Sequence, residues 1–362
     1  MTNSLPTAKP YLAAIKPYKA GKTARHPDVA PIKLSSNENA YGPSPKALEA
    51  FRTAAGSLHR YAESSCVALR EELVQMHGGT PDHYVCGAGS DELIGLLIHA
   101  YAGAGDEILF PEHAFLMYRI YTLAAGATPV TAKEVNRRAD VDALLAAVNE
   151  RTKIVFLANP NNPTGTYLPA TEVKRLRAHL PQHIILALDG AYTECVDAAD
   201  YEDGMAQALS MPNVVVLRTF SKLYGLPALR LGWMCADASI IEAIHRVRSP
   251  FNVNGVAQIV GLAALRDQEY LHQQRGLMLH QRAFMTKELR ALGVHVEDSQ
   301  GNFVLADVGT REEAVRLMAG LEQHHIYVRD VEAYYLPTCI RITMGTEEEN
   351  QRVLAVWKEL QA

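Results

Sequence analysis

The sequence of 362 residues lacks the features that mark membrane, secreted and nucleic-acid-binding proteins. It has no basic surplus for nucleic acid, because 35 Lys and Arg stand against 40 Asp and Glu, a formal net charge of −5. No apolar run is long enough to span a membrane, since "LIGLLIHAYAGAG" is short and contains His99. The first residues, "MTNSLPTAKPYLAAIKPYKAGK", lack the apolar core of a signal peptide.

Cysteine is scarce and shows no pattern. The five cysteines are scattered without a CxxC pair, so neither a disulfide framework nor a zinc site is expected. We therefore expect reduced, mostly buried thiols in a cytoplasmic protein that has no metal centre. The cysteines are Cys66, Cys86, Cys195, Cys235 and Cys339.

What the chain does contain is an alternation of short apolar runs with helical patterns. The runs "HYVCG", "DEILF", "KIVFLANP", "HIILALD", "NVVVLRT" and "LGWMCA" are typical of strands, and amphipathic segments such as "ATEVKRLRAHL" separate several of them. Strands that alternate with helices indicate βαβ units. The sequence therefore predicts an α/β fold with a mostly parallel sheet flanked by helices.

Three parts are expected along the chain. Residues 1–45 are polar and proline-bearing, which indicates an arm that packs on the rest of the molecule, including part of a small domain. Residues 46–265 form the predicted large domain. Residues 266–362 interleave strands with helices and form a smaller α+β domain. The segment from Asn254 to Leu292 has few helix breakers and predicts continuous helix.

Three of the predicted strands end in polar residues. "KIVFLA" is followed by "NPNNPTG" with Asn162, "HIILAL" ends at Asp189, and "NVVVL" leads into "RTFSK" with Lys222. Ligands of open α/β sheets bind at the carboxyl ends of strands, so these three side chains could meet in one crevice. Taken singly, the asparagine loop could be a simple turn, Asp189 could cap a helix, and Lys222 could reach solvent.

A fourth strand leads through "GAGSDE" into a helix. Backbone N–H groups at Ser90 and Asp91 could bind an anion there, and the glycines Gly87 and Gly89 would let a phosphate approach closely. The competing interpretation is an ordinary turn followed by a helix that Ser90 or Asp91 caps. Glu92 replaces the third glycine of a dinucleotide fingerprint, so that motif is not present.

Together the four loops offer what pyridoxal phosphate requires. Lys222 supplies an amine for the cofactor's aldehyde, and Asp189 supplies a carboxylate for the pyridinium nitrogen. Ring oxygen and phosphate both need hydrogen-bond donors. Asn162 and the "GAGSDE" loop could provide them, as could the hydroxyls and the arginine that flank Lys222, which are Thr219, Ser221 and Arg230.

These segments resemble a known family. "NPNNPTG", "LDGAY" and "TFSKLYGLPALRLGW" are similar to the fold-type-I pyridoxal-phosphate-dependent aminotransferases. "LSSNENAYGPSP", "RYAES", "GAGSDELI" and "CIRITMGT" resemble more narrowly its class-II subfamily of histidinol-phosphate aminotransferases. The resemblance runs through nearly the whole chain in the expected order.

The resemblance implies a role for each matched residue around the cofactor ring. Lys222 would form the Schiff base and act as general base and acid, and Asp189 would pair with the ring nitrogen. Asn162 and Tyr192 would bond the ring hydroxyl oxygen. Phe115 would stack on the ring, although "PEHAFLMY" departs from the commoner "PT-aromatic-x-x-Tyr" pattern.

The resemblance also implies a phosphate site and a homodimer. Tyr61 in "RYAES" matches a tyrosine that reaches the phosphate of the neighbouring subunit's cofactor, so two chains would share two active sites. Within one chain, the phosphate would be held by Ser90, Asp91, Thr219, Ser221 and Arg230.

Substrate choice is expected to depend on the second domain and on "NENAYG". Arg341 matches the arginine that binds the α-carboxylate of glutamate, and a guanidinium can bind a phosphate in the same bidentate way. Arg329 could add a second positive charge. From its neighbours alone, Arg329 could instead be a surface residue paired with Asp330 or Glu332.

The resemblance implies transfer of an amino group from L-glutamate to imidazole acetol phosphate. The products would be L-histidinol phosphate and 2-oxoglutarate, a step of histidine biosynthesis. Phenylalanine or tyrosine remain alternative substrates, because a mostly apolar pocket separates flat rings of similar size weakly. A decarboxylase or lyase acting on a phosphorylated amino acid would share these motifs. A non-catalytic regulatory protein is disfavoured because Lys222 is present.

Overall fold

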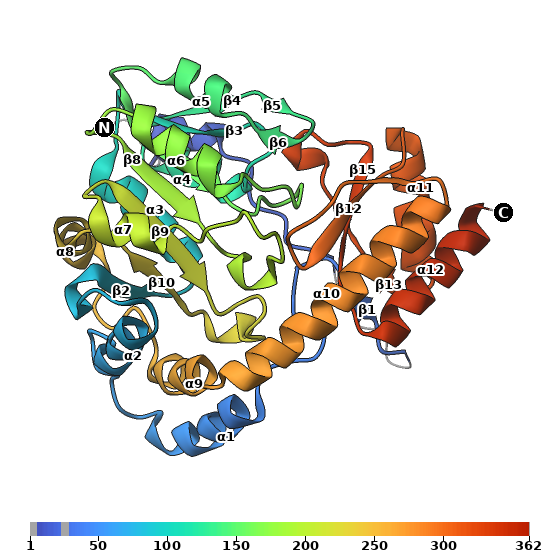
Figure 1. The fold of residues 1–362 in the computed structure, drawn as a ribbon, viewed down its shortest axis with the longest axis horizontal. Helices are drawn as coiled ribbons and strands as arrows, with labels where there is room; N and C mark the ends of the chain where they lie inside the picture. The colour runs from blue at the N-terminus through green and yellow to red at the C-terminus, as the bar shows by residue number, and fades with distance from the viewer. Residues whose placement is uncertain (1–5, 23–28, 362) are drawn as a thin grey trace.

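The computed structural model describes residues 6–22 and 29–361. The arm predicted over 1–45 and the small domain predicted over 266–362 therefore lie partly outside the described residues. Two sheets with separate cores organise the described part, and the larger sheet lies on the left of Figure 1 and the smaller one on the right.

The larger sheet has seven strands and is mostly parallel, as predicted. Only β10 runs antiparallel to its neighbours β2 and β9. The sheet order is β2 (Tyr84–Gly87), β10 (Gly232–Cys235), β9 (Val214–Thr219), β8 (Ile185–Asp189), β7 (Thr152–Ala158), β3 (Glu107–Pro111) and β4 (Thr128–Ala132).

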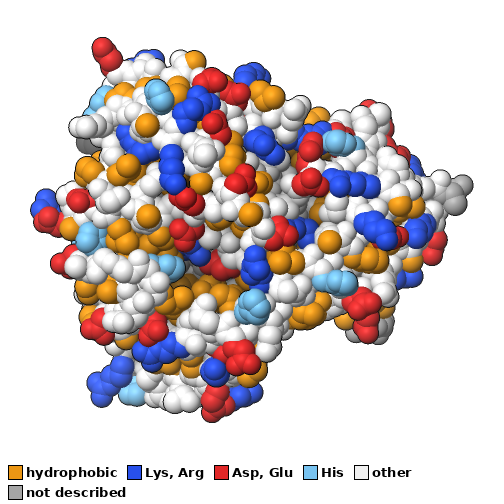
Figure 2. Space-filling view, in the orientation of Figure 1, with side chains coloured by type: hydrophobic (Ala, Val, Ile, Leu, Met, Phe, Trp, Pro, Cys, Tyr) orange, Lys and Arg blue, Asp and Glu red, His pale blue; other side chains and the backbone are white. Residues whose placement is uncertain are grey.

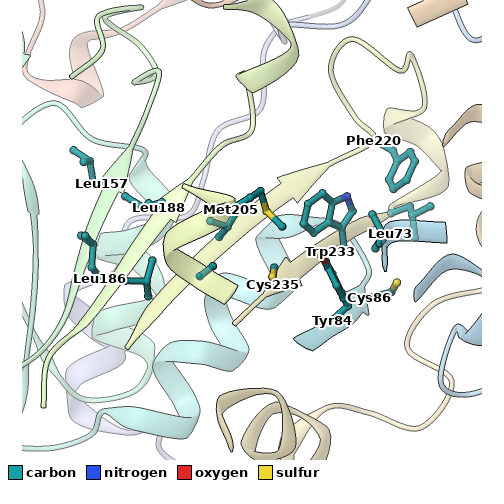
Figure 3. Close-up of a cluster of buried hydrophobic side chains, with 14 of the residues drawn as sticks. Leu73, Tyr84, Cys86, Leu157, Leu186, Leu188, Met205, Phe220, Trp233 and Cys235 are labelled. Carbon is teal, nitrogen blue, oxygen red and sulfur yellow. The ribbon is translucent and has the colours of Figure 1, made fainter. Parts of the chain in front are cut away.

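Helices cover both faces of this sheet, which explains why its strands are apolar almost throughout. All six residues of β9 are buried. One face packs against α3, α4 and α8, and the other forms the cluster of Figure 3, in which Trp233 meets Tyr84 at 6.0 Å between ring centroids. The helices of this part are α1 (Pro45–Ala54), α2 (Val67–His77), α3 (Ser90–Tyr101), α4 (Leu116–Ala124), α5 (Val141–Ala147), α6 (Ala170–His179), α7 (Met205–Ser210), α8 (Ala238–Val247) and α9 (Gly255–Arg266).

The smaller sheet has four antiparallel strands and its own core around Trp357. Its order is β11 (His295–Val296), β12 (Phe303–Asp307), β15 (Cys339–Thr343) and β14 (Arg329–Asp330). The helices α10 (Gln268–Ala291), α11 (Arg311–Gln323) and α12 (Glu347–Gln361) accompany it.

The prediction of one continuous helix from Asn254 to Leu292 is wrong. Helix α9 ends at Arg266 and α10 begins at Gln268, because Asp267 adopts a non-helical φ of −94° and ψ of 60°. The Asp267 carboxylate accepts a hydrogen bond from Lys46 Nζ of α1 at 2.8 Å. Since the break involves neither glycine nor proline and lies at a contact with a distant helix, local sequence gave little warning of it.

The N-terminal segment crosses from one sheet to the other. Its 3-10 helix η1 (Pro10–Ala14) contacts α4, whereas β1 (Ile32–Lys33) pairs in parallel with β13 (Ile326–Tyr327) beside the smaller sheet. The residues that follow β1 therefore run between the two parts of the molecule, where the blue trace lies in Figure 1.

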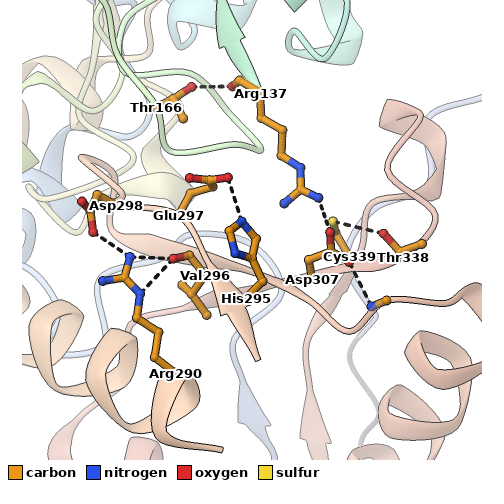
Figure 4. A network of polar contacts seen from close by, with 11 residues as sticks. Arg137, Thr166, Arg290, His295, Val296, Glu297, Asp298, Asp307, Thr338 and Cys339 are labelled. Atoms are coloured by element: carbon orange, nitrogen blue, oxygen red, sulfur yellow. Dashed lines mark hydrogen bonds and ion pairs between the residues drawn. The ribbon is translucent and has the colours of Figure 1, made fainter. Parts of the chain in front are cut away.

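A polar network also joins the two parts. The hairpin β5 (Glu134–Val135) and β6 (Arg138–Ala139) carries Arg137, whose guanidinium pairs with Asp307 of β12 and whose carbonyl accepts from Thr166 Oγ1 (Figure 4). The remaining short elements are η2 (Ala55–Ser57), η3 (Pro81–His83), η4 (Thr193–Cys195), η5 (Pro227–Leu229) and η6 (Glu332–Tyr334).

Charges of both signs are interspersed on the face shown in Figure 2. Within the described ranges, no helix is long and apolar enough to cross a membrane. The same part of the chain has no group of three or more His, Cys, Asp or Glu side chains placed to hold a metal ion.

Candidate active site

A cavity of about 400 Å³ lies at the carboxyl ends of β7, β8 and β9. Three neighbouring parallel strands of one sheet bring its polar side chains together, as the strand-end argument predicted. The cavity is lined by ten of the predicted residues, namely Ser90, Asp91, Phe115, Asn162, Asp189, Tyr192, Thr219, Ser221, Lys222 and Arg230.

Lys222 is half-buried and lines this cavity. It follows β9 in a turn closed by the Gly225 N–H, which donates to the Lys222 carbonyl at 2.9 Å. Burial, reinforced by the positive charge of Arg341, lowers the pKa of Lys222 to about 8. Near neutral pH the side chain can therefore supply a neutral amine, which a nucleophile and proton acceptor require.

Asp189, the last residue of β8, is buried and hydrogen-bonded on both oxygens. Oδ2 accepts from the Tyr118 hydroxyl at 2.6 Å, and Oδ1 accepts from the Ala191 N–H at 3.1 Å. Burial raises the pKa of Asp189 above its ordinary value, and the bonds from Tyr118 and Ala191 offset part of this rise. The two donors thus favour the ionised carboxylate that a pyridinium partner needs.

Sequence reasoning missed Tyr118. It lies on α4 three residues after Phe115, and its ring stacks on Phe156 with centroids 4.5 Å apart. The "aromatic-x-x-Tyr" spacing in "PEHAFLMY" was the available signal, because Phe115 is the N-cap of α4 and its ring centroid lies 5.9 Å from that of Tyr118.

The loop between β2 and α3 forms an anion cradle. Gly89 is the N-cap of α3 and has a φ of +87°, so Ser90 and Asp91 are inside the helix and do not cap it. A Cβ added to Gly89 would lie 2.6 Å from Arg230 Nη2, which shows how closely the arginine covers this loop.

Hydroxyls complete the cradle. Thr219 Oγ1 lies 3.0 Å from Ser221 Oγ, and Arg230 Nη1 lies 3.5 Å from the same oxygen. Helix N–H groups, hydroxyls and a guanidinium are the donors that bind a phosphate dianion. The ordinary capped-turn interpretation does not explain why these donors converge on one cavity.

Arg341 approaches the cavity from the smaller sheet. Its Nη1 donates to Asn162 Oδ1 and its Nη2 donates to the Ser35 carbonyl at 3.0 Å. The guanidinium is buried over the ring of Phe303 and forms no ion pair with any described residue. A buried cation without an anionic partner is expected where an anionic ligand binds.

Arg329 lies opposite Arg341 in the β14–β15 pair, but its guanidinium is held by the arm. It donates to the Lys19 carbonyl at 2.8 Å and lies over the Tyr18 ring, whose residue lines the cavity. Asp330 and Glu332 pair with Arg311, at 2.8 and 2.9 Å. The interpretation of Arg329 as a surface residue paired with either carboxylate is therefore wrong.

Tyr61 is the one predicted cofactor residue that lies away from the cavity of its own chain. Its side chain is 84% exposed and stacks on Phe251 at 4.5 Å between centroids. The arm contributes three residues to which the sequence analysis gave no individual role, although two of them belong to "NENAYG". Ser36 and Glu38 line the cavity, and Asn37 donates to the Tyr192 hydroxyl at 2.8 Å.

The geometry agrees with comparisons to known proteins. The sequence matches the family described as aminotransferase class I and II over residues 29–356. The chain is 48% identical to the histidinol-phosphate aminotransferase of Rhodospirillum centenum, with 96% of each chain covered, and 48% identical to that of Paramagnetospirillum magneticum, with 98% of each covered.

Solved structures show the same fold. The histidinol-phosphate aminotransferase of Sinorhizobium meliloti, in complex with pyridoxal-5'-phosphate, superposes with a TM-score of 0.90 at 27% identity, with 99% of each chain covered. The predicted fold, a large mostly parallel α/β part with a smaller α+β part, is confirmed. By its family match, its full-length relatives and its fold, the chain belongs to the class I and II aminotransferases.

Proposed function

We propose that the chain is a pyridoxal-phosphate-dependent aminotransferase that moves an amino group from L-glutamate to imidazole acetol phosphate, giving L-histidinol phosphate and 2-oxoglutarate. The observation that carries the chemistry is the meeting of an amine of lowered pKa, Lys222, with a carboxylate, Asp189, beside an anion cradle in one cavity. The names of the relatives from R. centenum and P. magneticum support the substrate.

The residues present fit the cofactor. Its phosphate would lie in the cradle, where a side chain at Gly89 would collide with Arg230. Asp189 would pair with its ring nitrogen, Asn162 and Tyr192 would bond its ring oxygen, and Phe115 would pack on its ring. Pyridoxal phosphate, when bound, supplies an aldehyde that takes up the amino group and a ring that withdraws electrons.

Each side chain then has a definite task. Lys222 Nζ has a pKa of about 8 and would take the proton from the donor's α-carbon. It would then give this proton to the former aldehyde carbon of the cofactor, which receives the amino group. Asp189 would keep the proton on the ring nitrogen, because the hydrogen bond that Tyr118 donates to Asp189 favours the ionised carboxylate. The mostly apolar wall of the cavity would exclude water and so strengthen both electrostatic contacts.

The substrate's anionic group would bind at Arg341. Arg341 has Nη1 and Nη2 directed at neutral oxygens, and its Nε has no partner among the described residues, so a carboxylate or a phosphate would add favourable contacts. Glutamate presents a carboxylate and histidinol phosphate presents a phosphate, and both are anions that a guanidinium binds. Arg329, opposite Arg341 across the β14–β15 pair, would add positive charge without a direct bond in the free enzyme.

The proposal includes a homodimer in which Tyr61 completes the partner's phosphate site. Several large apolar side chains are exposed on α1, α2, α9 and the segments beside these helices, as Tyr61 is, which favours a contact there between two chains. They are Phe51, Leu58, Val67, Phe251 and Ile259. A dimer contact would bury them and explain the 84% exposure of Tyr61 in a single chain.

Two further parts of the proposal concern organisation and location. Division into an arm (1–45), a large domain (46–265) and a small domain (266–362) is supported by the separate cores of the two sheets. A cytoplasmic location is supported by the five cysteines, which are all unpaired and buried.

The decisive experiment has two stages. Purified protein loaded with pyridoxal phosphate is first mixed with glutamate, and conversion to the pyridoxamine form is followed by absorbance. Glutamate formation from 2-oxoglutarate is then measured in parallel with histidinol phosphate, phenylalanine and tyrosine as donors. Conversion, with histidinol phosphate as the best donor, is expected. Absence of conversion would contradict any glutamate-dependent aminotransferase, and a better aromatic donor would contradict the proposed substrate.

A further inference from the structure

We propose that Asn37 is a positioning residue that orients the hydroxyl of Tyr192 toward the cofactor. Through Asn37, Tyr192 is connected to the arm and to the smaller sheet. The inference rests on the proposed function, because Tyr192 has this role only with a cofactor in the cavity. Asn37 belongs to the arm, 155 positions from Tyr192 in the sequence, and is 1% exposed.

All polar groups of Asn37 are engaged. Its Nδ2 donates to the Tyr192 hydroxyl oxygen at 2.8 Å, and its backbone N–H donates to Thr343 Oγ1 at 3.0 Å. Its Oδ1 accepts from Thr343 Oγ1, and its carbonyl accepts from Asn302 Nδ2, both at 3.0 Å. Thr343 and Asn302 belong to or adjoin strands of the smaller sheet, so one asparagine connects three parts of the chain.

The direction of the side-chain amide follows from Thr343. The Thr343 hydroxyl oxygen accepts from the Asn37 backbone N–H, and the hydroxyl donates its single proton to Asn37 Oδ1. The NH2 group of Asn37 must therefore face Tyr192. Because the Tyr192 oxygen accepts this bond, its own proton is free for an acceptor on the cavity side.

Tyr192 suits the role of donor. It is buried at the cavity wall, and its ring centroid lies 5.5 Å from Lys222 Nζ. Burial raises the pKa of Tyr192 well above its usual value, so it keeps its proton at neutral pH. A hydroxyl that accepts one bond donates a second one more strongly. Asn37 thus makes Tyr192 a better donor to the ring oxygen of the cofactor.

The backbone of Asn37 supplies a matched substitution. Its φ of +56° is in the left-handed region, which glycine and asparagine tolerate best. Asn37→Gly would remove the amide while keeping the backbone bonds to Thr343 and Asn302. Alanine would add backbone strain and is the poorer test.

The test is a pH titration of the visible absorbance of the bound cofactor. A weaker donor at Tyr192 leaves the ring oxygen more basic, so the nitrogen linking Lys222 to the cofactor should hold its proton to higher pH. Asn37→Gly should raise the midpoint by about half a unit to one unit, the size of one hydrogen bond. Tyr192→Phe should raise it at least as far, and adding Asn37→Gly to Tyr192→Phe should change it no further.

Asn302→Ala is the structural control, because it removes the bond to the Asn37 carbonyl and leaves the amide in place. It should lower the melting temperature of the cofactor-free protein and shift the midpoint less than Asn37→Gly does. No shift in Asn37→Gly, an equal shift in Asn302→Ala, or an undiminished shift in the Tyr192→Phe background would each overturn the inference. If the unmodified protein forms no covalent cofactor band, the proposed function itself fails.

Discussion

Lys222 lines the cavity and Arg341 reaches the cavity wall at Asn162, and burial has different consequences for these two cations. Lys222 comes from the larger sheet and Arg341 from the smaller one, and neither forms an ion pair with a described residue. Burial is the main cause that lowers both pKa values. Lysine can respond by losing its proton, with a pKa of about 8, whereas arginine stays charged because its pKa begins above 12.

The same physical penalty therefore yields two different groups. On the larger sheet it produces an amine that can form and break bonds and carry a proton. On the smaller sheet it leaves a permanent cation that an anionic ligand would stabilise. Substitutions at these two positions, and at the residues that support them, test whether chemistry and substrate binding are separated in this way.

The largest effect is expected from Lys222→Ala. Turnover should fall by about four orders of magnitude or more, because both the nucleophile and the proton carrier are removed. Non-covalent cofactor binding should persist, since the phosphate cradle is intact. Single-turnover kinetics and equilibrium dialysis with pyridoxal phosphate measure the two quantities. Loss of cofactor binding together with activity would show that the division between the two sides is incorrect.

Arg341→Ala should have the next largest effect, on the substrate side alone. We expect kcat/KM for both substrates to fall by about a hundredfold, since a buried charge-assisted contact is worth about 2–5 kcal/mol. The absorbance of the bound cofactor should be retained. Arg341→Lys is the matched control, which keeps a charge but loses the fork geometry and should recover only part of the activity. An intact KM in Arg341→Ala would argue against the anion site.

Lys222→Met should stabilise the cofactor-free protein. The folded-state pKa of about 8 lies below the ordinary lysine value of 10.5, so between these pH values the unfolded chain binds more protons than the folded one. The free energy of unfolding of the unmodified protein thus rises with pH over this window. Below pH 8 the buried charge costs about 3 kcal/mol, which Lys222→Met would recover.

Chemical denaturation of both cofactor-free proteins at several pH values checks this. The advantage of Lys222→Met should be largest near pH 7 and should diminish as the pH rises from 8 toward 10.5. An advantage that is independent of pH would show that packing, and not the charge of Lys222, is responsible.

The smallest effect is expected from Tyr118→Phe. The ring stack on Phe156 is kept, but Asp189 loses the hydrogen bond that helps hold down its pKa. The pKa of Asp189 should rise, which moves the acid limb of the kcat profile to higher pH. Near neutrality the rate should fall by about tenfold, as one hydrogen bond to a charged group is worth about 1.5 kcal/mol. A pH–rate profile with an unchanged acid limb would contradict the role of Tyr118.

Residues of the cofactor side could be predicted because each follows a strand of one sheet. Asn162, Asp189 and Lys222 stand directly after apolar runs, and the right-handed crossovers of a parallel sheet bring such positions to one edge. Tyr118 was missed because its partner, Asp189, is 71 positions away and only the packing of α4 on the sheet brings them together.

The substrate side was predicted less completely. Arg341 was identified only through resemblance, since nothing in "CIRIT" shows that its guanidinium would reach Asn162. Arg329 had two interpretations, a substrate-binding residue and a surface residue, and only the β14–β15 register places it opposite Arg341. Asn37 lies in "NENAYG" but its own role could not be predicted, because its bonds to Tyr192 and Thr343 connect segments that are 155 and 306 positions apart.

The sequence by itself determined the fold class and the amine, the carboxylate and the phosphate donors of the cavity. These follow from periodicity and from polar residues at strand ends, which are local properties of the chain. The tertiary structure alone decided how those groups are tuned. The lowered pKa of Lys222, the donor to Asp189, the burial of Arg341 and the engagement of Asn37 all depend on burial and on distant neighbours, which no local pattern encodes.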